Sequence, residues 1–271
     1  VITTVSSKNT ATAVVIKAVV DTRPEISSQS DQLLVTTGVA TQAGFDLSAT
    51  KYNLNSKITG DSSVITVRIV DTNGNPVADG VPVVFTTDYG AVGTSSRGGC
   101  TTINGSCAVT YSVQNPRPPD GGFALVTGST QIGTGSAISD SLRLLISNPD
   151  LLNLYTAASG GTVQSTFTAP SNTCKFTLSA FAGTAGGLPA PADTTVSALG
   201  LTSGFSAIVK TGSPVLDRTT NRAPISFEFD ATNVVPPCDP AGATPATATA
   251  EITFTSGTIV KKINVDIQYP R

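Results

Sequence analysis

Apolar and polar residues alternate in many short segments of the chain, and turn residues separate these segments. Residues 64–70, for example, have the sequence VITVRIV, and the turn-forming sequence DTNGNP follows at 71–76. Successive side chains of a β-strand point to opposite faces of a sheet, so this period of two predicts strands. The pattern predicts strands at residues 12–20, 64–70, 81–86, 106–113, 123–130, 136–146, 174–181, 194–199, 205–210, 225–229, 247–255 and 258–267. No segment of ten or more residues has the period of an α-helix, and we therefore predict an all-β chain of sandwiches or barrels.

Asn148, Pro149 and Asp150 form a turn-like segment between two series of predicted strands. We place a domain boundary there. It divides the chain into an N-terminal strand and linker at 1–28, a first domain at 29–148 and a second domain at 149–271. A weak internal repeat favours two similar domains. Residues 74–83 and 187–196 each contain a Gly-rich turn, a Pro, an Ala-Asp pair and the beginning of a strand.

Composition excludes several functions. Charged residues make up 13% of the 271 residues, and 16 Lys and Arg against 18 Asp and Glu give a formal net charge of −2. This balance argues against an electrostatic nucleic-acid binder. The chain contains no His, Met or Trp, which excludes Ser-His-Asp and Cys-His catalysis and His-ligated metals. Its apolar runs are shorter than the roughly 18–20 residues that a transmembrane helix needs. Because Met is absent, we expect the sequence to be a processed or excised piece.

Four cysteines occur in two settings. Cys100 and Cys107 flank a segment with an Asn-Gly dipeptide, which favours a type I′ hairpin turn because both central residues of that turn need positive φ. Such a hairpin would bring these two cysteines within disulfide reach. Cys174 precedes a predicted strand and Cys238 lies in a Pro-rich loop, and we pair them in a second disulfide. The alternative, a metal site of all four cysteines, lacks the close CxxC spacing of such sites. Two disulfides indicate an oxidising compartment, such as the periplasm, the cell surface or the medium.

The predicted strand at residues 12–20 has no core of its own, because the segment before Arg23 and Pro24 is too short to form one. Three interpretations remain open. The strand is the last strand of an upstream repeat, or it pairs within its own chain as the first strand of the first domain, or it is donated to a neighbouring subunit in a filament. In the third interpretation, residues 1–22 are the donated segment. The alternating side chains that would fill the neighbour's groove are Val14, Ile16, Ala18 and Val20.

The sequence VDTNGNPVADGVPVVFT at residues 70–86 resembles the core motif of bacterial Ig-like domains of the invasin and intimin type, the Big_1 group. Residues 100–118 resemble a later hairpin in a subset of these proteins, and residues 29–38 are similar to the leader into the domain. The resemblance extends over residues 29–147 and is looser over 150–271. It implies tandem Ig-like sandwiches in secreted, lipid-anchored or outer-membrane-anchored surface proteins, which serve as stalks or adhesive modules. It brings no catalytic residues.

One candidate metal site lies inside this motif. The oxygen-bearing side chains of Asp71, Asn73, Asn75 and Asp79 have spacings similar to those of a calcium loop. Prolines stand, however, where an EF-hand loop needs Gly and Glu. We favour a β-turn whose Asn and Asp side chains bond to the local backbone.

One candidate nucleophile also lacks the sequence context that its chemistry needs. Ser48 and Lys51 match the SxxK motif of penicillin-binding proteins, and residues 210–212 match their KTG motif. SxxK places Ser and Lys on one face of a helix, but no helical period follows Ser48. The third motif of these enzymes, Ser-Asp-Asn, is absent. We therefore interpret both matches as chance.

These observations predict a non-enzymatic structural module of a bacterial cell-surface or extracellular protein. It forms a rod-like stalk or filament subunit and needs no cofactor or metal. Its expected partners are copies of itself or tandem repeats, joined through β-strand addition. The alternative is an adhesin module that binds a host glycan or a host or cell-surface protein. Aromatic residues are only 6% of the chain, which disfavours an adhesin because aromatic side chains carry much of the binding energy at interfaces.

Overall fold

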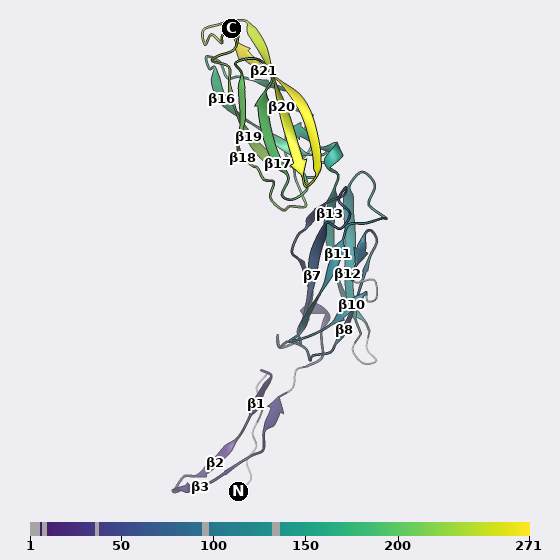
Figure 1. The fold of residues 1–271 in the computed structure, drawn as a ribbon. Coiled ribbons are helices and arrows are strands. Elements are labelled where there is room, and N and C mark those ends of the chain that lie inside the picture. The colour runs from purple at the N-terminus through teal and green to yellow at the C-terminus, as the bar shows by residue number, and fades with distance from the viewer. Residues whose placement is uncertain (1–5, 7–9, 36–37, 94–97, 132–135) are drawn as a thin grey trace.

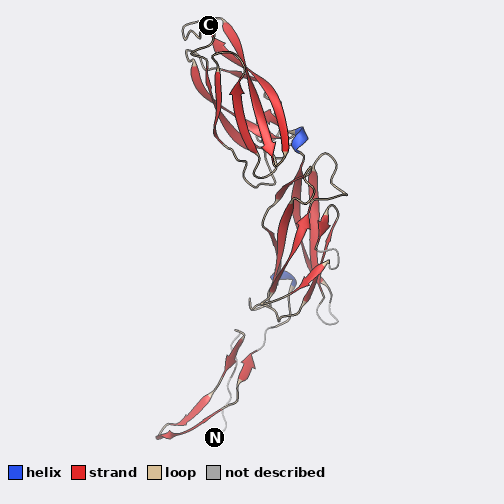
Figure 2. Ribbon diagram, viewed as in Figure 1, coloured by secondary structure: helices blue, strands red, loops and turns tan. Residues whose placement is uncertain are grey.

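We describe the protein from a computed structural model, over residue 6 and residues 10–35, 38–93, 98–131 and 136–271. In this part of the chain, every regular element is a β-strand except two short 3₁₀ helices (Figure 2). A β-hairpin, a first β-sandwich and a second β-sandwich follow one another from the N-terminus and lie end to end (Figure 1). The prediction of an all-β chain with tandem Ig-like sandwiches behind an N-terminal strand extension is confirmed.

The N-terminal hairpin consists of two strand pairs in line. β1 (Thr12–Val14) pairs antiparallel with β4 (Leu33–Val35), and β2 (Lys17–Val20) pairs antiparallel with β3 (Arg23–Gln29). The predicted strand at 12–20 therefore pairs within its own chain, but with the segment that follows it. It is not the first strand of the first sandwich, and that interpretation is wrong. The boundary expected at residue 28 falls inside β3.

The first sandwich packs a four-stranded sheet, ordered β5-β7-β11-β9, against a five-stranded sheet, ordered β10-β8-β12-β13-β6. Its strands alternate between the core and the surface, as the sequence predicts. In β7, for example, Ser63, Ile65, Val67 and Ile69 are buried, and the residues between them are more exposed. The elements are η1 (Gln42–Gly44), β5 (Phe45–Ala49), β6 (Asn53–Asn55), β7 (Ser62–Ile69), β8 (Pro82–Thr87), β9 (Ala91–Val92), β10 (Gly99–Thr101), β11 (Ser106–Ser112), β12 (Gly122–Thr130) and β13 (Ile138–Ser147).

The second sandwich packs two four-stranded sheets, ordered β14-β16-β19-β18 and β15-β21-β20-β17. Phenylalanines fill its centre, where the ring centroids of Phe167, Phe176, Phe205 and Phe227 lie between 5.2 and 6.1 Å from that of Phe229. The elements are η2 (Pro149–Leu151), β14 (Asn153–Tyr155), β15 (Thr166–Thr168), β16 (Lys175–Gly183), β17 (Thr195–Gly200), β18 (Ser206–Thr211), β19 (Ala223–Asp230), β20 (Pro245–Ser256) and β21 (Ile259–Pro270).

The two sandwiches share one turn, which is the structural form of the internal repeat. Residues 71–75 and 184–188 make the same two backbone hydrogen bonds, from the first N–H to the fifth carbonyl and from the fourth N–H to the first carbonyl. The fourth residue is Gly74 in one turn and Gly187 in the other, and both have φ of 80°, a conformation that favours glycine. A Pro follows each turn and bridges back to the end of the preceding strand.

Candidate functional site

The end of the first sandwich that faces the second one carries three buried polar side chains. Asn53 and Asn55 lie on β6, which pairs in parallel with the end of β13 and places Asn55 opposite Ser147. None of these three residues is more than 2% exposed. A buried polar group costs free energy unless it is hydrogen-bonded. All three side chains donate to partners in the second sandwich, whereas Asn53 Oδ1 is buried without a partner among the described residues.

Each of these side chains donates to the second sandwich. Ser147 Oγ and Asn53 Nδ2 donate to the carbonyls of residues 189–190, at 2.9 and 2.7 Å. Asn55 Nδ2 donates to Ser256, at 3.2 Å from its carbonyl oxygen and 2.9 Å from its Oγ. Hydrogen bonds are directional and strong in a dry environment. The three side chains therefore fix how the two sandwiches meet, and we call this contact the joint.

The covalent connection across the joint is short and ordered. The side chain of Asn148 accepts a hydrogen bond from the backbone N–H of Asp150 and so caps η2. Pro149 and Leu152 are buried, and the ring of Pro149 restricts its own φ. At the rim, Lys57 forms an ion pair with Asp150 at 2.7 Å. Both partners are exposed, so this pair contributes little to the stability of the joint.

The turn between β20 and β21 enters the joint at Gly257. This residue has φ of 61°, and a Cβ atom there would lie 2.4 Å from Ile58 Cδ1 of the first sandwich. The backbone conformation favours glycine, and a side chain there would displace the end of the Ile58 side chain.

The turn at residues 71–75 contacts the segments on either side of the N-terminal hairpin. Asn75 Oδ1 accepts a hydrogen bond from the backbone N–H of Ala11, at the base of the hairpin, at 3.3 Å. The carboxylate of Asp71 accepts one from the backbone N–H of Gly38 at 2.8 Å. In the second sandwich, residues 189–190, which directly follow the corresponding turn, contact the preceding unit.

The candidate calcium residues do not converge on one point. The Asp71 carboxylate accepts backbone hydrogen bonds from Gly38, Asn73 and Asn75. The bond from Gly38 is the largest of the effects that lower the pKa of Asp71 to about 2. Asp79 instead accepts a bond from the backbone N–H of Asn104, at 2.6 Å. Among the residues that the structure describes, no group of three or more His, Cys, Asp or Glu could hold a metal ion.

The structure joins Cys100 to Cys107 and Cys174 to Cys238, with S–S distances of 2.14 and 2.13 Å. The turn between the first two has positive φ at both central residues, 51° and 70°. The hairpin expected there consists of a single β-bridge, between Ile103 and Ser106. It extends no further because β10 and β11 belong to opposite sheets. The first disulfide therefore connects the two sheets of the first sandwich. The second ties the beginning of β16 to the loop between β19 and β20.

The SxxK and KTG residues lie apart. Ser48 is exposed on β5, and Lys51 Nζ forms an ion pair with Asp61 at 2.9 Å. Lys210 belongs to the second sandwich, where it forms an ion pair with Glu228 at 3.3 Å. Neither lysine is placed to activate Ser48, so the geometry offers no support for acyl-transfer chemistry.

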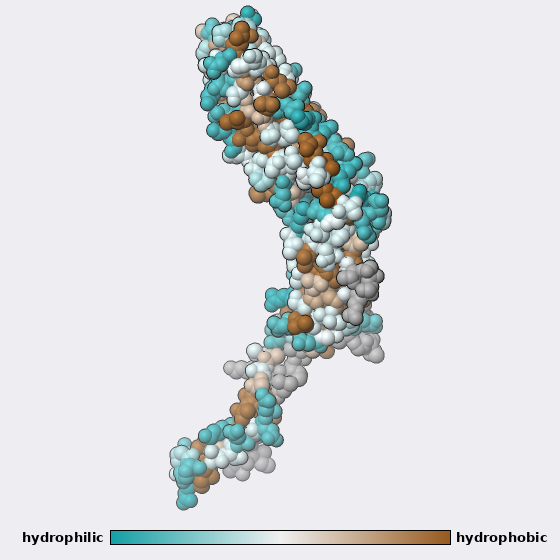
Figure 3. Space-filling view, viewed as in Figure 1, coloured by the Kyte–Doolittle hydropathy of each residue, from teal (hydrophilic) through white to brown (hydrophobic). Residues whose placement is uncertain are grey.

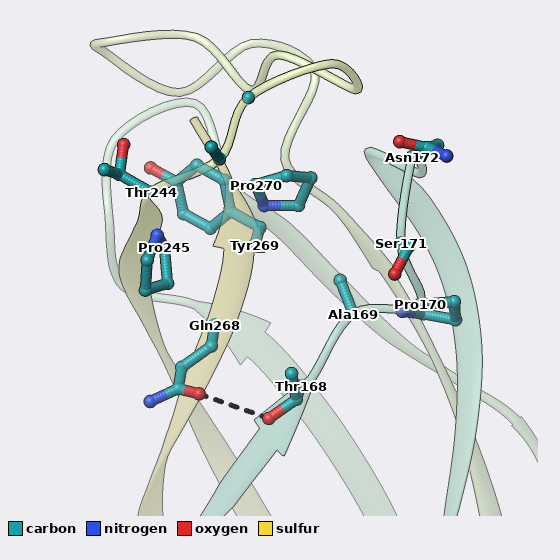
Figure 4. A pocket seen from close by; sticks show the side chains of 12 residues that line it. Thr168, Ala169, Pro170, Ser171, Asn172, Thr244, Pro245, Gln268, Tyr269 and Pro270 are labelled. Carbon is teal, nitrogen blue, oxygen red and sulfur yellow. Dashed lines mark hydrogen bonds between the residues drawn. The ribbon is translucent and has the colours of Figure 1, made fainter.

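A groove of about 300 Å³ lies at the C-terminal end of the second sandwich (Figure 4). Thr168 donates a hydrogen bond to Gln268 Oε1 at 3.2 Å on its floor, and Tyr269 and Pro245 lie beside them. The lining side chains are hydroxyls, amides, prolines and small apolar groups, and none is charged at neutral pH. The groove therefore lacks an acid–base pair, and Tyr269 is the one aromatic ring in its lining.

The residues predicted to make an intersubunit contact lie on the N-terminal hairpin. Val14, Ile16, Ala18 and Val20 occupy alternate positions in the sequence, but the strand is interrupted between β1 and β2, and its register shifts between Val19 and Val20. Val14 is 39% exposed and Val20 is 43% exposed, whereas Ile16 is half-buried. Brown apolar atoms are visible along the hairpin in Figure 3. Among the described residues, no second layer of structure covers the hairpin, which thus presents apolar side chains to solvent.

Comparison with known proteins gives similarities of fold. No family model and no curated protein sequence matches the chain. Among solved structures, the adhesin InvE of Yersinia pseudotuberculosis is 14% identical, with a TM-score of 0.32 over 84% of this chain and 60% of that one. A 282-residue C-terminal intimin fragment, solved with the intimin-binding domain of its receptor Tir, is 14% identical, with a TM-score of 0.33 over 86% and 64%. A titin fragment is 9% identical, with a TM-score of 0.25 over 82% and 97%.

The chain spans less than two thirds of the InvE and intimin structures that it matches. With TM-scores this low, the functions of these proteins do not carry over to this chain. None of the helices in the described part of the chain has the length and apolar character that a membrane crossing needs.

The residues that form the joint were not among those predicted from the sequence. Asn53 and Asn55 flank Leu54 in a segment where no strand was predicted, and all three are buried because the core covers one face of β6 and the second sandwich covers the other. Their sequence, polar-apolar-polar, is typical of an exposed edge. Only a contact 137 residues away in sequence reveals the role of Asn53.

Proposed function

We propose that this chain is a non-enzymatic, rod-like structural module of a bacterial cell-surface or extracellular protein. The observation that carries the proposal is the joint, where buried hydrogen bonds and a short capped connection hold two Ig-like sandwiches end to end. Such a joint preserves the direction of the chain from one unit to the next, which a stalk needs. The two disulfides fit an oxidising compartment.

The proposal extends to the hairpin at residues 12–35, which we take as the last two strands of a further Ig-like unit. In the two sandwiches of this chain, the closing hairpins are β12–β13 and β20–β21, and each lies in a sheet that is covered by a second one. The N-terminal hairpin has the same place before the first sandwich that β12–β13 has before the second, and Ala11 at its base donates to Asn75 in the turn that corresponds to residues 184–188.

The partner of this hairpin is an Ig-like sandwich that lacks its last two strands, contributed by another segment of the same polypeptide. Val14, Ile16, Ala18 and Val20 would face its interior through β-strand addition. A second copy of this chain offers no such vacancy, because both of its sandwiches contain their own closing hairpins. Donation of residues 1–22 alone is disfavoured, since residues 12–14 already pair with β4 and residues 17–20 with β3.

Replacing Asn53 and Asn55 with Leu tests whether the joint holds the two sandwiches together as one rigid rod. Leu keeps similar volume but removes both donors, and each carbonyl left unpaired in the joint costs about 1–3 kcal/mol. We expect both sandwiches to remain folded but to tumble independently, whereas in the original chain they share one rotational correlation time. ¹⁵N relaxation measures these times for each sandwich. Asn264→Leu, an exposed position on β21, is the matched control. Independent tumbling in the unchanged protein would contradict the proposed rod.

Deleting residues 1–35 tests the assignment of the hairpin. Among the described residues, none of the hairpin belongs to either hydrophobic core. We therefore expect the thermal unfolding of both sandwiches to be unchanged by the deletion. In the intact chain, we expect monomers in light scattering at high concentration and fast amide hydrogen exchange in the hairpin. Filaments that form from the intact chain and vanish on deletion would show donation to a second copy instead.

A further inference from the structure

Arg222 is the largest fully buried side chain among the described residues, with 1% of its surface exposed. It immediately precedes β19, at the end of the second sandwich that faces the joint. In the described part of the chain, no ion pair joins its guanidinium to a carboxylate. A buried charge without a counter-ion is costly unless hydrogen bonds satisfy it, and its partners therefore show what it holds.

The guanidinium donates to backbone carbonyls of two loops. Nε donates to Thr184 and Nη2 to Ala185, at 2.8 and 3.0 Å, in the turn after β16. Nη1 donates to Ala157 at 2.9 Å and also to Gly160, in the loop after β14. The planar fork of an Arg side chain suits this task because its donors diverge in fixed directions. Four carbonyl dipoles thus take the place of a carboxylate counter-ion.

An aromatic ring completes this environment. The Arg222 guanidinium carbon lies 3.7 Å from the ring centroid of Tyr155, a cation–π arrangement. Removal from water lowers the pKa of Arg222 below its ordinary value, and the neighbouring Tyr155 opposes this shift. Gly183 allows the close packing, because a Cβ atom there would lie 2.7 Å from Arg222 Cγ.

Arg222 contacts two segments, residues 155–160 and the turn after β16, and both are connected directly to the joint. Tyr155 ends β14, the first strand after the connection between the sandwiches. The turn at 184–188 continues into residues 189–190, whose carbonyls accept the hydrogen bonds of Ser147 and Asn53. Arg222 itself makes none of the hydrogen bonds across the joint that are described above.

We propose that Arg222 is a positioning residue, which sets the relative orientation of the two sandwiches by fixing the loop that receives Asn53 and Ser147. This inference rests on the proposed rod-like role. It assigns the rigidity of the joint to a side chain buried wholly within one sandwich. Without Arg222, the acceptor carbonyls at 189–190 lose their fixed position, although every donor of the first sandwich remains.

Residual dipolar couplings test the inference, since two rigidly joined sandwiches report one common alignment tensor. In the full chain, we expect Arg222→Met to abolish the common tensor while the couplings within each sandwich still fit its own structure. We expect Arg222→Lys to give the same loss, because one ammonium cannot reach carbonyls on both loops. Arg218→Met is the matched control, since Arg218 lies in the same connection and donates only to the Arg222 carbonyl at 3.2 Å among the hydrogen bonds described.

The outcomes separate this inference from the proposed function. A common tensor with unchanged orientation in both Arg222 variants would overturn the inference and leave the rod intact. Separate tensors in the unchanged protein would overturn the rod itself. If both variants unfold the second sandwich, Arg222 serves the fold as a whole, and the positioning role is rejected. The same loss in Arg218→Met would also reject it, because the effect would not depend on the guanidinium contacts of Arg222.

Discussion

Replacing Phe229 with Ala is expected to lower the free energy of unfolding of the second sandwich by about 3–5 kcal/mol. Phe229 is fully buried on β19 and contacts four other phenylalanine rings. Removing its ring leaves a cavity that rings anchored on several strands cannot collapse to fill. Since whole domains are stable by only about 5–15 kcal/mol, this loss is a large share of the total.

Calorimetry and circular dichroism suit this measurement, because the chain has no Trp to serve as a fluorescent probe. Phe123→Ala is the matched control. Phe123 is half-buried near the beginning of β12, where the Arg143 guanidinium carbon lies 4.1 Å from its ring centroid. We expect this variant to lose much less stability. Equal losses in the two variants would mean that the aromatic cluster is not the centre of the core.

The strands of both sandwiches could be predicted because the alternation of apolar and polar residues is visible within each short segment of the sequence. In β7, the side chains that point inward follow directly from the period of two, and one face of the strand is buried as that period requires. The shared turn was also visible in sequence, since Gly74 and Gly187 each precede a Pro by two residues. Where a local backbone conformation requires one residue type, the sequence alone is sufficient to predict that part of the fold.

The joint could not be predicted, because no pattern in the sequence around its residues indicates that they are buried. Asn53 and Asn55 are buried only through contact with carbonyls of another sandwich. Arg222 has no acidic neighbour in sequence and takes its partners from loops 37 to 65 residues away. A buried polar side chain becomes recognisable only when its distant partner is known.

The pairing of the N-terminal strand was missed for a different reason. Its partner β3 has the sequence RPEISSQ, which is polar and contains a Pro, and such a segment is typical of a linker. Residues of β3 are exposed on both faces, so burial imposes no apolar pattern on the strand.

Removing the Cys174–Cys238 disulfide is expected to destabilise its sandwich more than removing the Cys100–Cys107 disulfide destabilises the other. With sequence separations of 64 and 7, the loop-closure entropies of the unfolded chain correspond to about 4 and about 2.5 kcal/mol. The longer loop contains four of the eight strands of the second sandwich, from β16 to β19. Its cross-link therefore excludes far more unfolded conformations.

The double variants Cys174→Ala with Cys238→Ala, and Cys100→Ala with Cys107→Ala, form a matched pair. Equilibrium unfolding in urea gives the loss of stability for each sandwich, and reduction of the unchanged protein should reproduce both losses. The Cys100–Cys107 bond connects opposite sheets through the short strand β10, so it also restrains the folded state. If its removal costs more than removal of the longer cross-link, that restraint on the folded sandwich outweighs loop entropy, and the expected order is wrong.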